Sequence, residues 1–219
     1  MSDRHVVFLD LDGTIIDSSP GIVAGLREAY RAVGIDAPED AVLLSWIGQP
    51  AAVTLERELG GRGDDVVEAA NGAFRTYFDE FGMHESQPYI GISEAMAAVA
   101  ADGAVICVVT HKPLRLSEAA LEQHDLRGLV HSVHAPPSPA EFMAKEDLFA
   151  QAISATDPAT RIAAGDRGTD IQAAQAHGMA SVGVTWGFGT ADELLAAGAV
   201  ALASAPGELP ALVAPRASQ

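Results

Sequence analysis

Residues 5–14 read HVVFLDLDGT, an apolar run that ends in two aspartates, a glycine and a threonine. The apolar letters predict a buried β-strand over residues 5–10. Two carboxylates that close a hydrophobic run are costly unless they are used, because a buried charge needs a partner. Asp10 and Asp12 would share a side if the strand continued that far, since side chains alternate along a strand. This stretch therefore predicts a strand that ends at a chemical site.

The rest of the chain beyond residue 88 alternates short apolar runs with helical patterns, which is typical of an α/β protein with a parallel sheet. Further strands are predicted over residues 104–109, 130–134, 161–164, 180–184 and, more weakly, 199–203. Helices are predicted over residues 93–101, 114–124, 145–154, 169–177, 190–197 and 206–213. We expect a doubly wound, Rossmann-like parallel sheet.

The alternation fails between Thr14 and Pro88, where only helical signals occur. Ser19 followed by Pro20 is typical of a helix start, with the serine as N-cap. Later helices in this stretch are predicted over residues 38–47, 50–59 and 64–81. We therefore expect a core domain of residues 1–17 and 88–219, interrupted by an inserted α-helical domain of residues 18–87.

Composition excludes several classes of function. The formal net charge of −17 argues against binding a nucleic acid polymer or an anionic membrane, because both need basic surface. The N-terminal residues lack the layout of a signal peptide, and no apolar run is long enough to span a bilayer. The single cysteine, Cys107, reads as a buried strand residue. We expect a cytoplasmic monomer or homodimer that acts on a small molecule.

Acidic residues recur where strands end, and ligands of open parallel sheets bind at the carboxyl ends of the strands. Asp10 and Asp12 follow the first strand, and Asp166 and Asp170 follow the strand over 161–164. Each pair of carboxylates at about 4 Å would cost roughly 4 kcal/mol at an effective dielectric near 20, so the cluster needs a cation. Ligands that are all oxygen suit Mg²⁺.

Four residues can be given chemical roles. Asp10 is the expected nucleophile, because a carboxylate is ordinarily ionised at neutral pH and needs no activating base. Asp12 suits acid–base work, since its anionic neighbours favour holding a proton for a leaving alkoxide. Thr110 can donate a hydrogen bond to a phosphate, and Lys145 can place a charge against the phosphate and Asp10.

The chain resembles phosphatases of the haloacid dehalogenase superfamily that carry a helical cap inserted after the first motif. The resemblance covers nearly the whole chain and rests on DLDGTIIDS, WIGQP, PYIGI, VVTHKP, Lys145, AGDRGTDIQAA and GVTWGFGTADEL. It implies an aspartyl-phosphate on Asp10, acid–base work by Asp12, and phosphate contacts from Thr110 and Lys145. It also implies Mg²⁺ held by Asp10, the Asp12 backbone carbonyl and Asp166, with support from Asp170.

Within the superfamily the chain looks most like phosphoglycolate phosphatases, on SSPGIVAGLREAYRAVG and the WIGQP loop. Gly48 and Gln49 of that loop are the expected substrate-reading element of the cap. His111 stands where relatives often carry asparagine or serine, and we expect it beside the phosphate. The context of Lys145, PPSPAEFMAKEDL, and the GDR triplet are also similar to 5′-nucleotidase-like relatives. The expected reaction is Mg²⁺-dependent hydrolysis of a small phosphomonoester, with a 5′-nucleotidase as the alternative.

Three other readings have less support. A sugar-phosphate mutase would carry a histidine early in the first cap helix, where this chain has Ser18-Ser19-Pro20-Gly21. A dehalogenase has no use for Asp12 or for a metal. A non-catalytic binding relative is disfavoured because the whole set of site residues is present.

Overall fold

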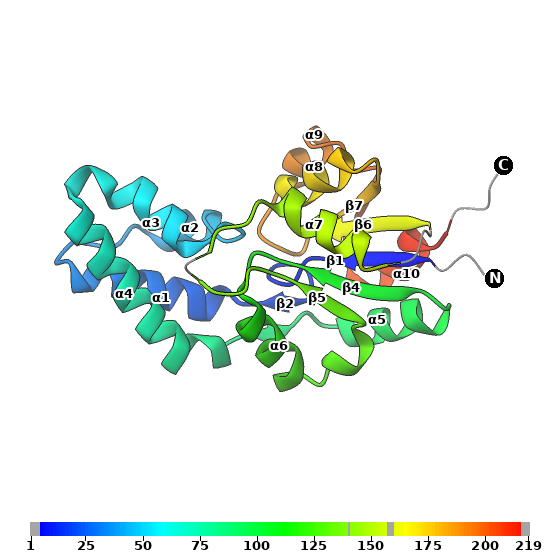
Figure 1. Ribbon diagram of the computed structural model, residues 1–219, viewed down its shortest axis with the longest axis horizontal. Coiled ribbons are helices and arrows are strands. Elements are labelled where there is room, and N and C mark those ends of the chain that lie inside the picture. The colour runs from blue at the N-terminus through cyan, green and yellow to red at the C-terminus, as the bar shows by residue number, and fades with distance from the viewer. Residues whose placement is uncertain (1–4, 140, 157–159, 216–219) are drawn as a thin grey trace. The chain divides into compact units, whose positions relative to one another are not determined.

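The structure is a computed structural model that describes residues 5–139, 141–156 and 160–215. It divides into two compact units (Figure 1). The first unit joins the residues up to Ile16 with those from Pro88 onward, and the second unit is Asp17–Gln87.

The first unit is built on a six-stranded parallel sheet in the order β5-β4-β1-β6-β7-β8. The chain runs outward from the central strand β1 through β4 to β5, then returns to the other side of β1 and continues outward from β6 to β8. This is the doubly wound order expected from the sequence. The strands are β1 (Val6–Leu9), β4 (Val105–Val109), β5 (Ser132–His134), β6 (Arg161–Gly165), β7 (Ala180–Val184) and β8 (Ala201–Ala203).

Helices cover both faces of this sheet (Figure 1). Alternate residues of the strands feed two separate apolar clusters, as the period of two along a strand requires. One cluster includes Val7 and Leu9 of β1 and packs against α5, α6 and α10. The other includes Val6 and Phe8 and packs against α7 and α8. The helices are α5 (Ile92–Ala101), α6 (Leu114–Gln123), α7 (Lys145–Ser154), α8 (Gly168–Ala176), α9 (Ala191–Ala196) and α10 (Leu209–Val213).

Two of the differences between predicted and observed bounds in this unit involve 3₁₀ turns. The strand predicted over 130–134 begins only at Ser132, after a 3₁₀ turn at Arg127–Leu129. The helix predicted over 206–213 is split into a 3₁₀ turn, Pro206–Glu208, and the short α10. Cys107 lies on β4 and is fully buried, as expected.

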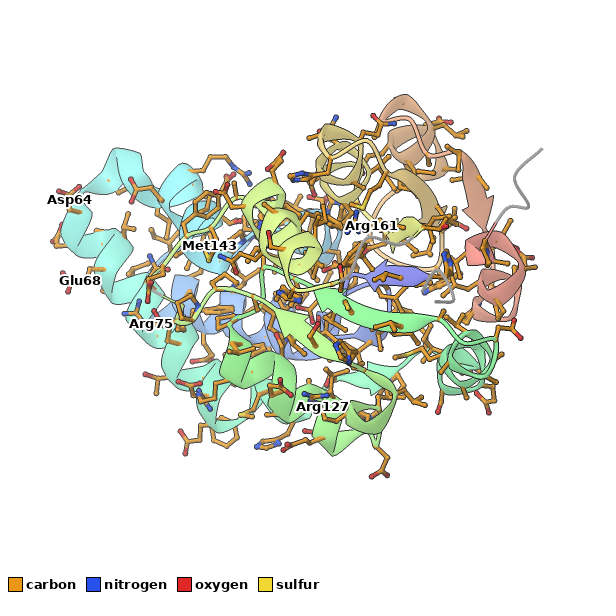
Figure 2. All side chains as sticks on the ribbon, turned by 45° about the vertical axis from the view of Figure 1, so that its right-hand side comes forward. Asp64, Glu68, Arg75, Arg127, Met143 and Arg161 are labelled. Carbon is orange, nitrogen blue, oxygen red and sulfur yellow. The ribbon has the colours of Figure 1, made fainter. Side chains whose placement is uncertain are left out.

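The second unit is helical. Its helices are α1 (Ser19–Ala32), α2 (Asp40–Ser45), α3 (Ala51–Leu59) and α4 (Asp64–Glu80), with 3₁₀ turns at Gly60–Arg62 and Gly82–His84. Leu26, Leu43 and Leu55 lie in its own buried core. Figure 2 shows the exposed acidic side chains Asp64 and Glu68 on α4.

Close backbone packing inside the second unit depends on glycine. A Cβ at Gly21 of α1 would lie 2.1 Å from the carbonyl oxygen of Gly82, so no larger residue fits there.

The start of α1 differs from the prediction, because Ser19 is already helical and the cap position is Ser18. Asp17 does the capping instead, as its Oδ1 accepts bonds from Ser19 N at 2.9 Å and Ser19 Oγ at 2.6 Å.

Two very short strands were not predicted, β2 (Ile16–Asp17) and β3 (Gln87–Pro88), which pair with each other. The helix predicted over 38–47 is also shorter, Asp40–Ser45. Over the part of the chain that the structure describes, no helix combines the length and the apolar character needed to cross a membrane.

Candidate active site

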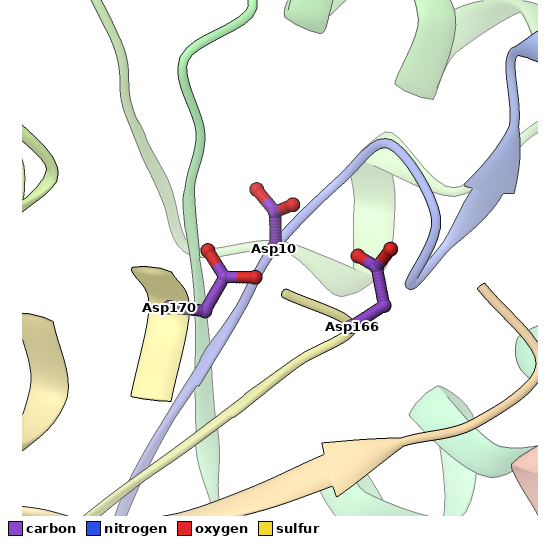
Figure 3. Close-up of side chains that lie close together, drawn as sticks. All are labelled: Asp10, Asp166 and Asp170. Carbon is purple, nitrogen blue, oxygen red and sulfur yellow. The ribbon is translucent and has the colours of Figure 1, made fainter. Parts of the chain in front are cut away.

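Three aspartates from two neighbouring strand ends meet in the first unit. Asp10 follows β1, Asp166 follows β6, and Asp170 lies in the first turn of α8. Each contributes a carboxylate oxygen to a group whose members all lie within 4.8 Å of one another, and all three residues are buried (Figure 3). β1 and β6 are adjacent at the point where the strand order reverses, which is where ligands bind in doubly wound sheets.

Lys145 is the cation of this cluster. It is the first residue of α7, and only 5% of its side chain is exposed. Its Nζ lies 2.7 Å from Asp10 Oδ1 and 2.9 Å from Asp170 Oδ1. Three carboxylates and one ammonium leave a formal charge of −2 when all four are ionised, which is the charge that one divalent cation neutralises.

The electrostatics of the cluster favour positive charge beside the carboxylates. Burial raises the pKa of Asp10 to about 7, against the opposing effect of Lys145. Burial, and then the charges of Asp170 and Asp10, raise the pKa of Asp166 well above its usual value. Burial thus works against the ionised form of Asp10, because it removes the water that stabilises the anion, and a further cation beside the carboxylate would favour that form.

The same surroundings act on the lysine in the opposite sense. Burial disfavours the ammonium, yet the Asp10 and Asp170 carboxylates outweigh it and raise the pKa of Lys145 above its usual value. Lys145 thus stays charged, and it alone does not balance the three acids. A buried donor set of carboxylate oxygens fits a hard divalent cation, and nothing in the cluster favours a softer metal.

Asp166 is held rigidly. Thr14 Oγ1 donates to its Oδ1 at 3.2 Å, and the backbone N–H of Phe188 donates to its Oδ2 at 2.9 Å. The indole of Trp186 in turn donates to the carbonyl oxygen of Thr14 at 3.1 Å. The 186–189 segment follows β7, where it can either border the site or simply close a turn. It is a border, because its backbone orients a carboxylate of the cluster.

Gly13 allows Asp166 to come this close. Its φ is +88°, and a Cβ there would lie 2.2 Å from Asp166 Oδ2. We expect Gly13→Ala to displace the Asp166 carboxylate and to weaken divalent-metal binding at least tenfold, because the backbone strain and the clash act together. Isothermal titration of the metal-free protein would measure this. Gly34→Ala has the same kind of positive φ but open space around the Cβ, and it serves as the control.

Asp170 has two jobs. Its Oδ2 accepts the backbone N–H of Arg167 at 3.0 Å at the start of α8, while its Oδ1 contacts Lys145. Taken alone, the GDRGTD segment is also compatible with a purely structural reading in which these acids cap a helix. That reading holds for one oxygen of Asp170 but does not account for the other, or for the burial of Asp166.

Asp12 does not join the carboxylate cluster. Its two oxygens lie 3.0 and 3.4 Å from Lys112 Nζ. The alternation that would have placed it beside Asp10 does not extend that far, because β1 ends at Leu9. Lys112 lies between β4 and α6, and its contact with Asp12 brings it to the same strand ends as the cluster.

The remaining predicted residues lie in different units, Thr110 and His111 in the first and Gly48 and Gln49 in the second. Thr110 is buried just past β4, and its Oγ1 accepts the Lys112 backbone N–H at 3.1 Å, which leaves its hydroxyl hydrogen for another acceptor. The ring of His111 stacks near that of Phe142 at a centroid distance of 6.1 Å. Gly48 and Gln49 belong to the second unit, between α2 and α3, and their role stays a prediction.

Comparison with known proteins finds relatives that carry more than one named activity. The curated relatives include a 5′-nucleotidase of Pseudomonas aeruginosa, 29% identical over 87% of this chain and 86% of its own. A phosphoglycolate phosphatase of Pectobacterium atrosepticum is 32% identical over 82% of this chain and 79% of its own. The tyrosine-protein kinase PtkA of Mycobacterium tuberculosis is 29% identical over 86% of this chain, which spans only 64% of that longer protein.

The fold has a close counterpart among solved structures. The crystal structure of a predicted phosphatase from Clostridium acetobutylicum superposes with a TM-score of 0.87 at 27% identity, covering 96% of this chain and 98% of that one. The family model described as haloacid dehalogenase-like hydrolase matches residues 6–184. The chain therefore belongs to the haloacid dehalogenase-like hydrolase family.

Proposed function

We propose that this protein is a Mg²⁺-dependent phosphatase that hydrolyses a small phosphomonoester through an aspartyl-phosphate on Asp10. The observation that carries the proposal is the buried group of Asp10, Asp166 and Asp170 with Lys145 against it. A carboxylate nucleophile, an ammonium and a deficit of positive charge in one buried place suit phosphoryl transfer, whose catalysis is mainly positioning and charge stabilisation.

The metal would be held by Asp10 and Asp166, with the Asp12 backbone carbonyl as a further oxygen and Asp170 in support. When bound, Mg²⁺ supplies positive charge that neutralises the phosphate and favours the ionised form of the nucleophile. Lys145 keeps the Asp10 carboxylate in place through its 2.7 Å contact. Thr110 offers its hydroxyl hydrogen to a phosphate oxygen.

The reaction then has two halves. An Asp10 oxygen attacks phosphorus, the bond from phosphorus to the ester oxygen breaks, and that oxygen keeps the electron pair and takes a proton from Asp12. In the second half a water oxygen attacks the same phosphorus and gives its proton to Asp12. The Asp10–phosphorus bond breaks, and inorganic phosphate and the free carboxylate result.

Substrate choice is assigned to the second unit. We propose that residues 18–87 act as a cap, with Gly48 and Gln49 in the loop that reads the leaving group. The resemblance and a relative named phosphoglycolate phosphatase support a small phosphoglycolate-type ester. The relative named 5′-nucleotidase supports the alternative. A screen that includes 2-phosphoglycolate and nucleoside 5′-monophosphates separates the two, with kcat/KM as the readout.

The relative named as a tyrosine-protein kinase suggests a second possible acceptor for the phosphoryl group, a tyrosine hydroxyl in place of water. Transfer to a tyrosine hydroxyl would label protein from [γ-³²P]ATP, whereas hydrolysis releases free phosphate. We expect release of free phosphate. A location in the cytoplasm and a monomeric or homodimeric state remain part of the proposal, and size-exclusion chromatography with light scattering tests the second.

Removal of divalent metal is expected to lower phosphate release from p-nitrophenyl phosphate by about 10²-fold or more, because the cluster then lacks its main positive charge. Dialysis against EDTA followed by added Mg²⁺ measures the loss and its recovery. Mg²⁺ should also raise the free energy of unfolding of the metal-free protein, by about 2.7 kcal/mol at one hundred times its Kd. Full activity after exhaustive chelation would contradict the metal assignment.

A further inference from the structure

Lysine is scarce in this chain. It occurs at two positions in the 219 residues, Lys112 and Lys145, and every other member of the 13 lysines and arginines is an arginine. Lysine is ordinarily a surface residue, almost never buried unless paired. Here both lysines are buried, and each contacts a carboxylate at the strand ends. The proposed mechanism assigns work to Lys145 but none to Lys112.

The contact of Lys112 with Asp12 is close and largely shielded from water. The exposed fractions of the two side chains are 6% and 14%. Nζ lies 3.0 Å from Oδ1 and 3.4 Å from Oδ2, so the ammonium faces both oxygens and fixes the orientation of the carboxyl group. Salt screens such a shielded pair much less than it screens an exposed one.

The backbone of Lys112 is fixed as well. Its N–H donates to Thr110 Oγ1 at 3.1 Å, and its carbonyl oxygen accepts from Ser117 Oγ of α6 at 2.8 Å. Pro113 follows and restricts the chain further. Lys112 thus lies on a rigid segment just past β4, and its side chain contacts the carboxyl group of Asp12 just past β1. The strands β1 and β4 pair directly.

We propose that Lys112 is a positioning residue for Asp12 and aims its carboxyl group at the oxygen of the leaving group. This inference rests on the proposed function. An ammonium only donates hydrogen bonds, so the proton that Asp12 gives away lies on the part of the carboxyl group that faces away from Lys112. Without Lys112 the carboxyl group can rotate, and protonation of the leaving oxygen becomes less efficient.

The test compares two leaving groups. p-Nitrophenolate departs without a proton, whereas the alkoxide released from benzyl phosphate needs one. We expect Lys112→Met to lower the ratio of kcat/KM for benzyl phosphate to that for p-nitrophenyl phosphate by about 10-fold or more, within the range of general acid catalysis. Because kcat/KM reports on formation of the aspartyl-phosphate, the later attack of water does not enter. Lys112→Gln repeats the comparison if the methionine variant does not fold.

The control is Arg115→Met, which removes one positive charge from an exposed position three residues on and should leave the ratio unchanged. In an Asp12→Asn background, Lys112→Met should lower the ratio no further, since the lysine acts through Asp12. Equal losses on both substrates would mean that Lys112 binds the phosphate directly and would overturn the proposal. Full additivity with Asp12→Asn would overturn it too. Failure of the proposed function looks different, because wild type would then be inactive or Asp10→Asn active.

Discussion

Asp10→Asn is expected to lower kcat for p-nitrophenyl phosphate by about 10⁴-fold or more, the scale on which removal of a nucleophile acts. The amide of asparagine keeps the shape of the side chain but cannot form the bond to phosphorus. Phosphate release with and without Mg²⁺ measures the loss. Rapid acid quench and peptide mass spectrometry should find a phosphorylated Asp10 peptide in wild type and none in the variant.

A matched control for this substitution is Asp102→Asn, which makes the same chemical change at an exposed residue. It should retain the activity of the wild type. Equal activity of Asp10→Asn and wild type would rule out Asp10 as the nucleophile, whatever the metal dependence. If the metal-bound wild type hydrolysed none of the phosphate esters, the result would favour the interpretation that this protein binds a ligand without catalysing a reaction.

Lys145→Met is expected to lower the free energy of unfolding of the metal-free protein by about 3–5 kcal/mol, the usual cost of removing one partner from a buried ion pair. The reason is local, because the variant removes the ammonium that contacts Asp10 and Asp170 in this buried group of three carboxylates. Urea denaturation in the presence of EDTA measures the change. Added Mg²⁺ should recover part of it, since the metal replaces the missing charge.

An exposed ion pair provides the comparison. Arg27 and Asp40 form one in the second unit, with side chains 49% and 65% exposed, and Arg27→Met should cost about 1 kcal/mol or less. A Lys145→Met cost as small as that of Arg27→Met would show that the carboxylates do not depend on the lysine. Phosphatase activity of Lys145→Met should also fall, because Asp10 loses the contact that places it.

Much of the fold can be predicted from the order of apolar runs, turn residues and helical patterns along the sequence. The strands of the core were predicted because apolar runs and turn residues bound them, and the parallel order follows from their alternation with helices. β2 and β3 were missed because two residues carry no periodicity. The shorter α2 and the split before α10 show that the ends of an element depend on packing and on proline rather than on pattern alone.

The site divides in a similar way. The sequence was enough to predict that four residues lie close together, because the carboxyl ends of parallel strands meet at one edge of the sheet. These residues are Asp10, Lys145, Asp166 and Asp170. The hydrogen bond from Phe188 to Asp166 could not be predicted from the sequence, since its donor is a backbone amide, which every residue except proline carries. The carboxyl group of Asp12 lies outside that group because the alternation ends with β1 at Leu9, and its pairing with Lys112 joins positions one hundred residues apart.

The scarcity of lysine makes the active site readable by spectroscopy without a tag. Because lysine occurs only at positions 112 and 145, a ¹³C label placed on lysine ε-carbons gives magnetic resonance signals from the active site alone. One signal reports on the carboxylates around Asp10 and the other on the carboxyl group of Asp12. A single substitution assigns both. The surroundings of Asp10 and those of Asp12 can therefore be monitored separately in the intact protein.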